Sequence, residues 1–297
     1  MHAKLAVGLS MLLSFGAAMA AAQDTAPAAV SPAASAPGNS PDYSAVNCSG
    51  FIGDKVPDDL RVISGEQSNV KVIFSTNDYI YINRGRDKGV QVGDRFSVVR
   101  PEKDPVKVPW FKWQTKLLKA MGEQYVDLGQ VRVVNVQANV SVAQVGFTCD
   151  YMQRGDILRP YVERPTPTYK DASTFDRFAP VNGKHVAMVV EGGTIGQASG
   201  RNTAVYVNLG TSQGVHIGDY YRIFRYQGSM AETVRQTKGY AYQLYGFGSA
   251  PEKYEWKDLP REVIGEGIVI NAGPNASTML ITYSSLEVFS GDYVEVE

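Results

Sequence analysis

The chain has 297 residues, of which 44% are hydrophobic, and it contains 29 Gly and 17 Tyr. This composition is ordinary for a globular protein rich in β-structure. Its 29 Lys and Arg nearly balance its 30 Asp and Glu, so the formal net charge is −1. No basic excess exists to neutralise a phosphate backbone, and we therefore expect no nucleic-acid partner.

Residues 1–22 are typical of a secretory signal peptide. Lys4 supplies the positive start, residues 5–19 form a short apolar core, and Ala20-Ala21-Ala22 offers small residues for cleavage. The core is short for a transmembrane helix, although an uncleaved anchor is the alternative. We expect a periplasmic or secreted chain that is not an integral membrane protein after signal cleavage.

Residues 23–44 are rich in Ala, Pro and Ser. Such a segment cannot bury enough apolar surface to offset the entropy lost on ordering. The composition predicts a disordered tether before the first folded unit.

The rest of the chain repeats itself. Residues 81–94 return without a gap as 206–219, and a later echo pairs Gly155-Asp156 with Gly291-Asp292. Two copies of one unit are thus expected, at 45–160 and 181–297, with a linker at 161–180. The shared residues are turn formers, namely Gly85, Gly89, Gly93, Asp94, Gly155 and Asp156 in the first copy and Gly210, Gly214, Gly218, Asp219, Gly291 and Asp292 in the second.

Short runs of alternating or β-branched residues predict strands in both copies. In the first copy they lie at 60–63, 69–74, 79–82, 95–100, 131–136, 141–145 and 157–158. In the second copy they lie at 186–190, 203–207, 220–224, 267–271, 278–283 and 293–296. Many short strands with regularly spaced turns predict an all-β chain of two tandem small antiparallel barrels, because closure hides strand edges. Residues 163–168, Glu-Arg-Pro-Thr-Pro-Thr, predict a stiff link between them.

The repeated aspartates allow two interpretations. An Asp after Gly and before a strand commonly hydrogen-bonds its own backbone in a turn. A calcium or catalytic carboxylate is the alternative, but calcium loops need several closely spaced oxygen ligands. We expect turn residues, no metal and no cofactor.

Cys48 and Cys149 are the two cysteines of the chain. Both fall in the first copy, and the corresponding positions of the second copy hold Ser173 and Ser285. In an exported protein, two cysteines without counterparts in the second copy predict a disulfide with each other. Two separated cysteines do not make a zinc site.

Each copy carries a different insert at the same place, at 101–127 and 226–260. Residues 110–121 of the first insert predict a short Lys-rich helix. Aromatic side chains offer large contact area at low entropic cost. Three interpretations are open: the aromatic side chains cover an open barrel end, contact a protein partner, or contact a cell-wall glycan or membrane surface. The candidate interaction residues are Trp110, Phe111, Trp113, Tyr240, Tyr242, Tyr245 and Trp256.

Catalytic motifs are missing from the sequence. His185 and His216 fall in a strand and a turn region, and no nucleophile elbow or HExxH motif occurs. Glu262 and Glu266 could serve as a glycosidase pair, but nothing selects them from the 30 acids. We expect no enzyme, with a polysaccharide-active hydrolase as the least favoured alternative.

The pattern Tyr-Val-Asn-x-Gly-x-x-x-Gly-Val-x-x-Gly-Asp, followed by Arg, an insert, Gly-x-x-Val and a final Gly-Asp, resembles the C-terminal domain of flagellar assembly protein T. The resemblance covers residues 79–158 and 205–296, as two tandem copies. That family forms part of a periplasmic ring around the flagellar motor and has no catalytic residues to carry over. The resemblance implies a non-enzymatic envelope scaffold or binding module that contacts a protein partner, with a peptidoglycan-binding or polysaccharide-binding module as the alternative. Oligomers are possible.

Overall fold

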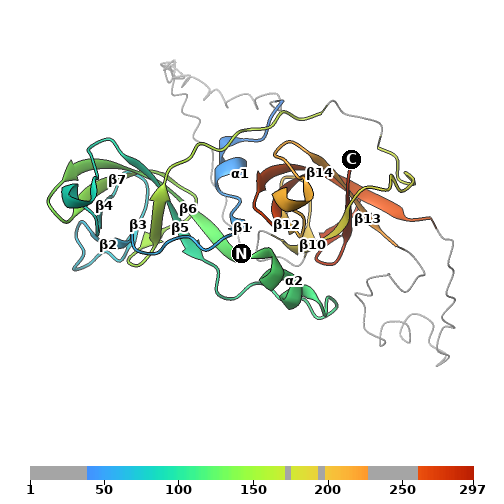
Figure 1. Ribbon diagram of the computed structural model, residues 1–297, viewed down its shortest axis with the longest axis horizontal. Helices are drawn as coiled ribbons and strands as arrows, with labels where there is room; N and C mark the ends of the chain where they lie inside the picture. Colours follow the sequence, from blue (N-terminus) through green and yellow to red (C-terminus); the bar gives the residue numbers. More distant parts are fainter. Residues whose placement is uncertain (1–38, 171–174, 193–197, 227–259) are drawn as a thin grey trace, which may run out of the picture. The chain divides into compact units, whose positions relative to one another are not determined.

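The computed structural model describes residues 39–170, 175–192, 198–226 and 260–297. This part of the chain is built mainly of antiparallel β-strands (Figure 1). We refer to residues 45–160 as the first copy and to residues 181–297 as the second copy.

The first copy and the turn before it contain two helices, a short 3-10 turn and a series of strands. The helices are α1 (Tyr43–Asn47) and α2 (Gln114–Met121), and the 3-10 turn is Arg86–Lys88. The strands are β1 (Phe51–Gly53), β2 (Val62–Gly65), β3 (Ile73–Phe74), β4 (Tyr79–Ile82), β5 (Arg95–Pro101), β6 (Glu123–Val136), β7 (Ser141–Thr148), β8 (Met152–Gln153) and β9 (Ile157–Pro160).

From β2 onward, the strands and the 3-10 turn of the first copy recur in the same order in the second copy. Its 3-10 turn is Thr211–Gln213. Its strands are β10 (Val186–Gly192), β11 (Ala198–Ser199), β12 (Ala204–Val207), β13 (Tyr220–Arg225), β14 (Glu262–Ala272), β15 (Ser277–Ser284), β16 (Val288–Phe289) and β17 (Tyr293–Val296).

Strand pairing runs in the same order in both copies. The second copy forms a closed antiparallel barrel in the order β10-β12-β15-β14-β13-β17. The first copy forms a sheet in the order β2-β4-β7-β6-β5-β9, and β1 pairs with β6 beside that path. Each copy also has a separate two-stranded sheet, formed by β3 and β8 in the first copy and by β11 and β16 in the second. The predictions of a mainly β chain and of an antiparallel barrel are confirmed.

Backbone hydrogen bonds also join the two edge strands of the first copy. The Val62 amide donates to the Asp156 carbonyl at 2.9 Å, and the Gly155 amide donates to the Val62 carbonyl at 2.8 Å. In the second copy Val189 makes the same two bonds, to the Asp292 carbonyl and from the Gly291 amide, both at 2.8 Å. The later Gly-Asp turn therefore meets the first long strand in the same way in each copy.

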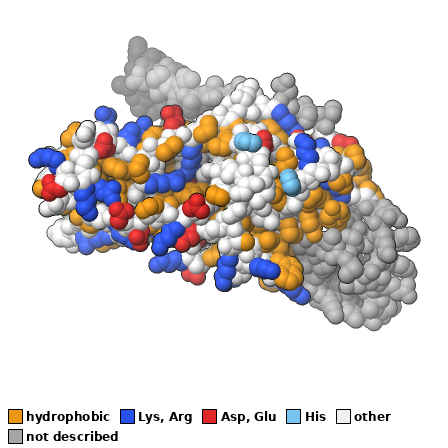
Figure 2. Space-filling model, viewed as in Figure 1, with side chains coloured by type: hydrophobic (Ala, Val, Ile, Leu, Met, Phe, Trp, Pro, Cys, Tyr) orange, Lys and Arg blue, Asp and Glu red, His pale blue; other side chains and the backbone are white. Residues whose placement is uncertain are grey.

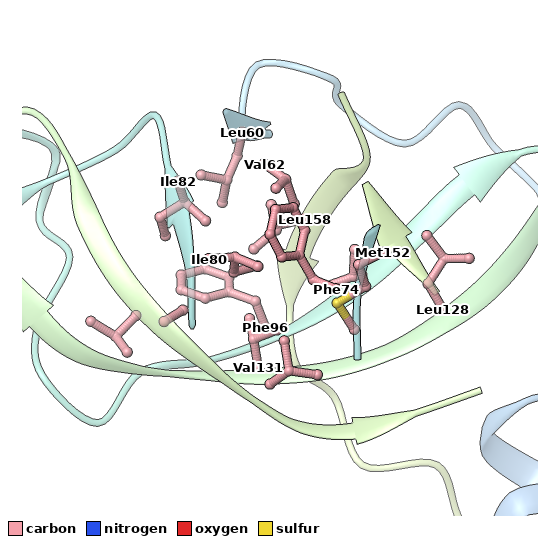
Figure 3. Close-up of a cluster of buried hydrophobic side chains, with 14 of the residues drawn as sticks. Leu60, Val62, Phe74, Ile80, Ile82, Phe96, Leu128, Val131, Met152 and Leu158 are labelled. Atoms are coloured by element: carbon pink, nitrogen blue, oxygen red, sulfur yellow. The ribbon is translucent and has the colours of Figure 1, made fainter. Parts of the chain in front are cut away.

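Each copy has its own hydrophobic core, which follows from the alternation of its strands. In β4, Ile80 and Ile82 are fully buried, while Tyr79 and Tyr81, which alternate with them, are partly exposed. Val205 and Val207 occupy the same positions of β12 and are also fully buried. Figure 3 shows the core of the first copy, where side chains from several strands meet, among them Leu60, Phe74, Phe96, Val131 and Leu158.

Two pairs of equivalent glycines in the copies meet different physical requirements. Gly89 and Gly214 end the 3-10 turns with φ of 81° and 79°, in the left-handed region that costs other residues energy. Gly85 and Gly210 instead lie against the backbone of the facing hairpin, where a Cβ would collide with carbonyl oxygens. One pair is required by conformation and the other by space.

The predicted disulfide is confirmed. Cys48 follows α1 and Cys149 follows β7, and the two are bonded with a Cα–Cα distance of 5.3 Å. The bond closes a separation of 101 residues in sequence. In the chain-entropy model a loop of this length stabilises the fold by roughly 4–5 kcal/mol.

Some boundaries differ from the expected ones. The strand expected at 69–74 is limited to β3, because Val70 and Val72 are 76% and 67% exposed and have no sheet to cover. The strand expected at 131–136 begins at Glu123, which shortens the insert expected at 101–127. The second insert lies almost wholly outside the described residues.

The linker is held by ion pairs to both copies. The Arg164 guanidinium donates two hydrogen bonds to the Asp127 carboxylate, at 2.8 and 2.7 Å. Lys170 pairs with Glu266 at 2.9 Å and also contacts Glu297. The extended segment between the copies is therefore attached to the strands on either side.

Candidate interaction surface

The first insert packs on the second copy. Phe111, Leu118 and Met121 from the insert form one buried cluster with Val190 and Tyr206 of the second copy. Because these side chains cover each other, α2 uses its apolar face inside the protein. The insert thereby connects two units that lie far apart in sequence.

Hydrogen bonds fix the insert in this place. Gln114 is 2% exposed, and its side-chain amide donates to the carbonyls of Val106 and Val190 at 2.8 and 2.9 Å. The Gln114 carbonyl oxygen accepts from the Val108 amide at 2.9 Å. The Trp110 indole donates to the Ser290 carbonyl at 2.9 Å. Every polar atom of the Gln114 amide group is thus used to hold the insert together and to attach it to β10.

The aromatic residues predicted for interaction divide into separate groups. Phe111 is 5% exposed and belongs to the core between the copies. Trp110 is partly buried and meets the Phe289 ring edge-on, with 6.1 Å between the ring centroids. Trp113 is 67% exposed. The remaining candidates, Tyr240, Tyr242, Tyr245 and Trp256, lie outside the described residues.

Lysines surround the exposed tryptophan. Lys112, Lys116 and Lys119 are all exposed, and the Lys116 ammonium lies 5.8 Å from the centre of the Trp113 ring. Figure 2 shows Lys and Arg side chains beside hydrophobic ones where Figure 1 places α2. We call Lys116 and Lys119 of α2, together with Lys112 and Trp113 of the turn before it, the basic face of α2.

A buried carboxylate lies at the contact between insert and barrel. Glu191 of β10 is 3% exposed, and its Oε1 accepts from the Val106 amide at 2.7 Å. Its Oε2 has no hydrogen-bond partner among the described residues. Burial, assisted by the nearby Glu102, raises the pKa of Glu191 to about 7, against the opposing effects of the Val106 bond and of the Gln124 side chain. Burial also raises the pKa of Tyr206 well above its usual value.

Each of the four repeated aspartates accepts a hydrogen bond from the backbone amide of the residue three positions earlier. The donors are Gln91 for Asp94, Gln153 for Asp156, His216 for Asp219 and Phe289 for Asp292, at distances of 2.9, 2.6, 2.8 and 2.7 Å. Such a bond closes the turn that enters the next strand.

The later aspartate of each copy has a second partner. Arg100 donates two hydrogen bonds to Asp156, at 2.8 and 2.9 Å. Arg225 donates two to Asp292, at 2.7 and 2.8 Å. Both aspartates are buried, at 3% and 1% exposure. The forked pair therefore ties the strand before the insert to the strand that closes each copy.

Other candidate groups are placed as follows. Glu262 pairs with Arg177, and Glu266 pairs with Lys170 at 2.9 Å, so the two acids face separate cations. His185 and His216 are exposed. Among residues 39–170, 175–192, 198–226 and 260–297, no three His, Cys, Asp or Glu side chains gather as metal ligands do. In the same residues no helix is long and apolar enough to cross a membrane.

The first copy also contains a polar hollow of about 780 Å³ beside its forked pair. Arg100, Tyr125 and Tyr151 line it, together with acids that include Glu102 and Glu123. Tyr151 is 43% exposed, and the Arg100 guanidinium lies 4.9 Å from the centre of its ring. An exposed ring among charged groups can stack against a sugar.

Several of these residues were not predicted. Arg100 and Asp156 recur in both copies, but their pairing depends on the register of strands that are distant in sequence. The burial of Gln114 could have been predicted from the sequence, since Gln114 is a polar residue in the apolar register of a short helix. The burial of Glu191, at the end of an apolar run, could have been predicted in the same way.

A comparison with models of protein families gives no match. A comparison with curated proteins gives none either.

Proposed function

We propose that this chain is a non-enzymatic, exported component of the cell envelope that acts as a scaffold or binding module. The observation that carries the proposal is that the repeated residues and the unrepeated residues have different roles. The residues that repeat close turns and pair strands, whereas the exposed Trp113 and its lysines belong to an insert that does not repeat. A duplicated framework that supports an unrepeated surface suits binding better than catalysis.

Both copies are proposed to be barrels of one kind. The matching strand order and the matching bonds of Val62 and Val189 support this. Export is supported by the disulfide, since such bonds persist in oxidising compartments. The resemblance to flagellar assembly protein T is consistent with a periplasmic scaffold, and a place in a ring remains part of the proposal.

Co-purification tests the proposal. The full chain carrying Trp113→Ala is compared with wild type for the proteins that it retains from its own cells. Phe178→Ala is the matched control, because Phe178 is similarly exposed at 64% but lies far from the insert in sequence. We expect one specific protein to be lost with Trp113→Ala alone. Equal recovery with all three proteins contradicts a partner at this surface.

A second candidate function is binding of a cell-wall polymer, favoured by the hollow beside Tyr151. Sedimentation with purified peptidoglycan tests it, with Tyr151→Ala as the variant. If the wild type co-sediments with peptidoglycan and Tyr151→Ala does not, the wall-binding module is supported. If both proteins co-sediment equally, or if neither co-sediments, the wall-binding module is rejected.

A further inference from the structure

One segment of this nearly neutral chain is strongly basic. Residues 105–122 contain Lys107, Lys112, Lys116 and Lys119 and no Asp or Glu, although the whole chain carries a net charge of −1. All four lysines are exposed. The first insert therefore contains a local run of lysines without acids, although Glu102, Asp104 and Glu123 flank that run.

Helical spacing places two of these lysines together. Lys116 and Lys119 are three residues apart in α2, a spacing that lies on one side of a helix. Lys112 lies in the turn just before α2. Trp113 lies at the border of this side, where its ring is 67% exposed.

Several cations of the framework are paired with carboxylates. Arg100, Arg164, Arg225 and Lys170 all form close ion pairs with carboxylates. Within the part of the chain that the structure describes, Lys112, Lys116 and Lys119 have no carboxylate partner. Like charges held side by side without counter-charges favour an anionic partner.

The support beneath the basic face is rigid. Phe111, Leu118 and Met121 are buried against the second copy, and Gln114 is fully hydrogen-bonded beneath the helix. Because the apolar face of α2 is already covered, the helix cannot insert that face into a lipid layer as an interfacial helix does. A single exposed ring between lysines is better suited to a protein surface, where tryptophan is common at energetic centres.

We propose that the basic face of α2 binds an acidic segment of a partner protein, with Trp113 packing against an apolar side chain beside that segment. This inference rests on the proposed function and names the chemistry of its partner. Charge attraction brings the segment to the surface, and the fixed helix lets it bind without a cost for ordering the insert.

Binding of a labelled oligoglutamate peptide to the full chain tests the inference by fluorescence anisotropy. The oligoglutamine peptide of equal length is the peptide control. The test variant is Lys112→Gln/Lys116→Gln/Lys119→Gln, and the charge-matched control is Lys55→Gln/Lys88→Gln/Lys184→Gln, whose exposed lysines lie outside the first insert. We expect the test variant to bind at least about 10-fold more weakly, because three exposed charge contacts are lost. The control variant keeps wild-type affinity, and added salt weakens binding.

Equal losses in both variants, or binding of oligoglutamine as strong as that of oligoglutamate, overturn the inference. Binding of anionic lipid vesicles without binding of oligoglutamate also overturns it, in favour of a membrane partner. If oligoglutamate fails while Trp113→Ala still loses a protein on co-purification, the chemistry is wrong and the proposed function stands. If both fail, the proposed function is wrong as well.

Discussion

In the first copy Asp156 closes a turn and holds Arg100, and in the second copy Asp292 closes the same turn and holds Arg225. The copies differ in what is attached to this shared framework. The disulfide belongs to the first copy, and the first insert lies on the second copy. The comparison teaches that the repeat preserves a way of folding, while the disulfide and the first insert are features of the first copy that the repeat does not share.

The largest effect is expected from the unshared disulfide. Replacing both Cys48 and Cys149 by Ser should lower the free energy of unfolding by roughly 4–5 kcal/mol, because the unfolded chain regains the freedom of a long loop. Denaturant unfolding of the variant measures the change. Wild type under reducing conditions should show the same loss. An unchanged midpoint of denaturant unfolding would mean that the stability of the first copy does not depend on its disulfide.

The second-largest loss of stability is expected for the two repeated aspartates that pair with an arginine. Asp156→Ala and Asp292→Ala should each cost about 3 kcal/mol or more, because a partly buried arginine loses its partner. Asp94→Ala and Asp219→Ala are matched controls that remove the turn bond without a forked arginine pair, and each should cost about 1 kcal/mol. Four equal losses in denaturant unfolding would show that the arginines contribute little.

The contact between the copies should depend on pH through Glu191. Its pKa is raised to about 7 from an ordinary 4.5, so the folded state binds the proton more tightly than the unfolded state. The stability that Glu191 contributes is therefore full below about pH 4.5 and is lost as the pH rises toward 7. Glu191→Gln should remove this decline and raise stability above pH 7 by roughly 2 kcal/mol. Parallel pH profiles for variant and wild type would contradict the burial of a strained carboxylate here.

The smallest effect concerns the paired glycines. Gly89→Ala and Gly214→Ala should each cost about 1–2 kcal/mol, because both positions need the left-handed backbone. Lys88→Ala, an exposed neighbour, is the control and should change little. Thermal unfolding distinguishes them, and a loss in only one copy would break the structural equivalence of the turns.

Local pattern was enough to predict much of the framework. Alternation located β4 and β12, and the absence of counterparts in the second copy identified the Cys48–Cys149 pair. It failed at Val70 and Val72, where a β-like run has no neighbouring sheet to cover it. The rule that alternation means a strand holds only when tertiary packing offers a face to bury.

The surface was predictable only in part. The Lys-rich helix and its aromatic residues are visible in the sequence, but their fates depend on contacts with distant residues. Gln114 meets Val190, and Trp110 meets Ser290, across long separations that no local pattern encodes. Packing on the second copy buries Phe111 and leaves Trp113 exposed, which decides what remains for a partner.

The central claim is that the first insert is fixed on the second copy and presents Trp113 outward to a protein. Photo-cross-linking in cells, with a photoreactive amino acid replacing Trp113 in the full chain, tests it most directly. The account predicts one protein adduct from position 113 and none of that mass from position 178. Adducts only within the chain itself, for example to residues 227–259, or the same adducts from both positions, would contradict it.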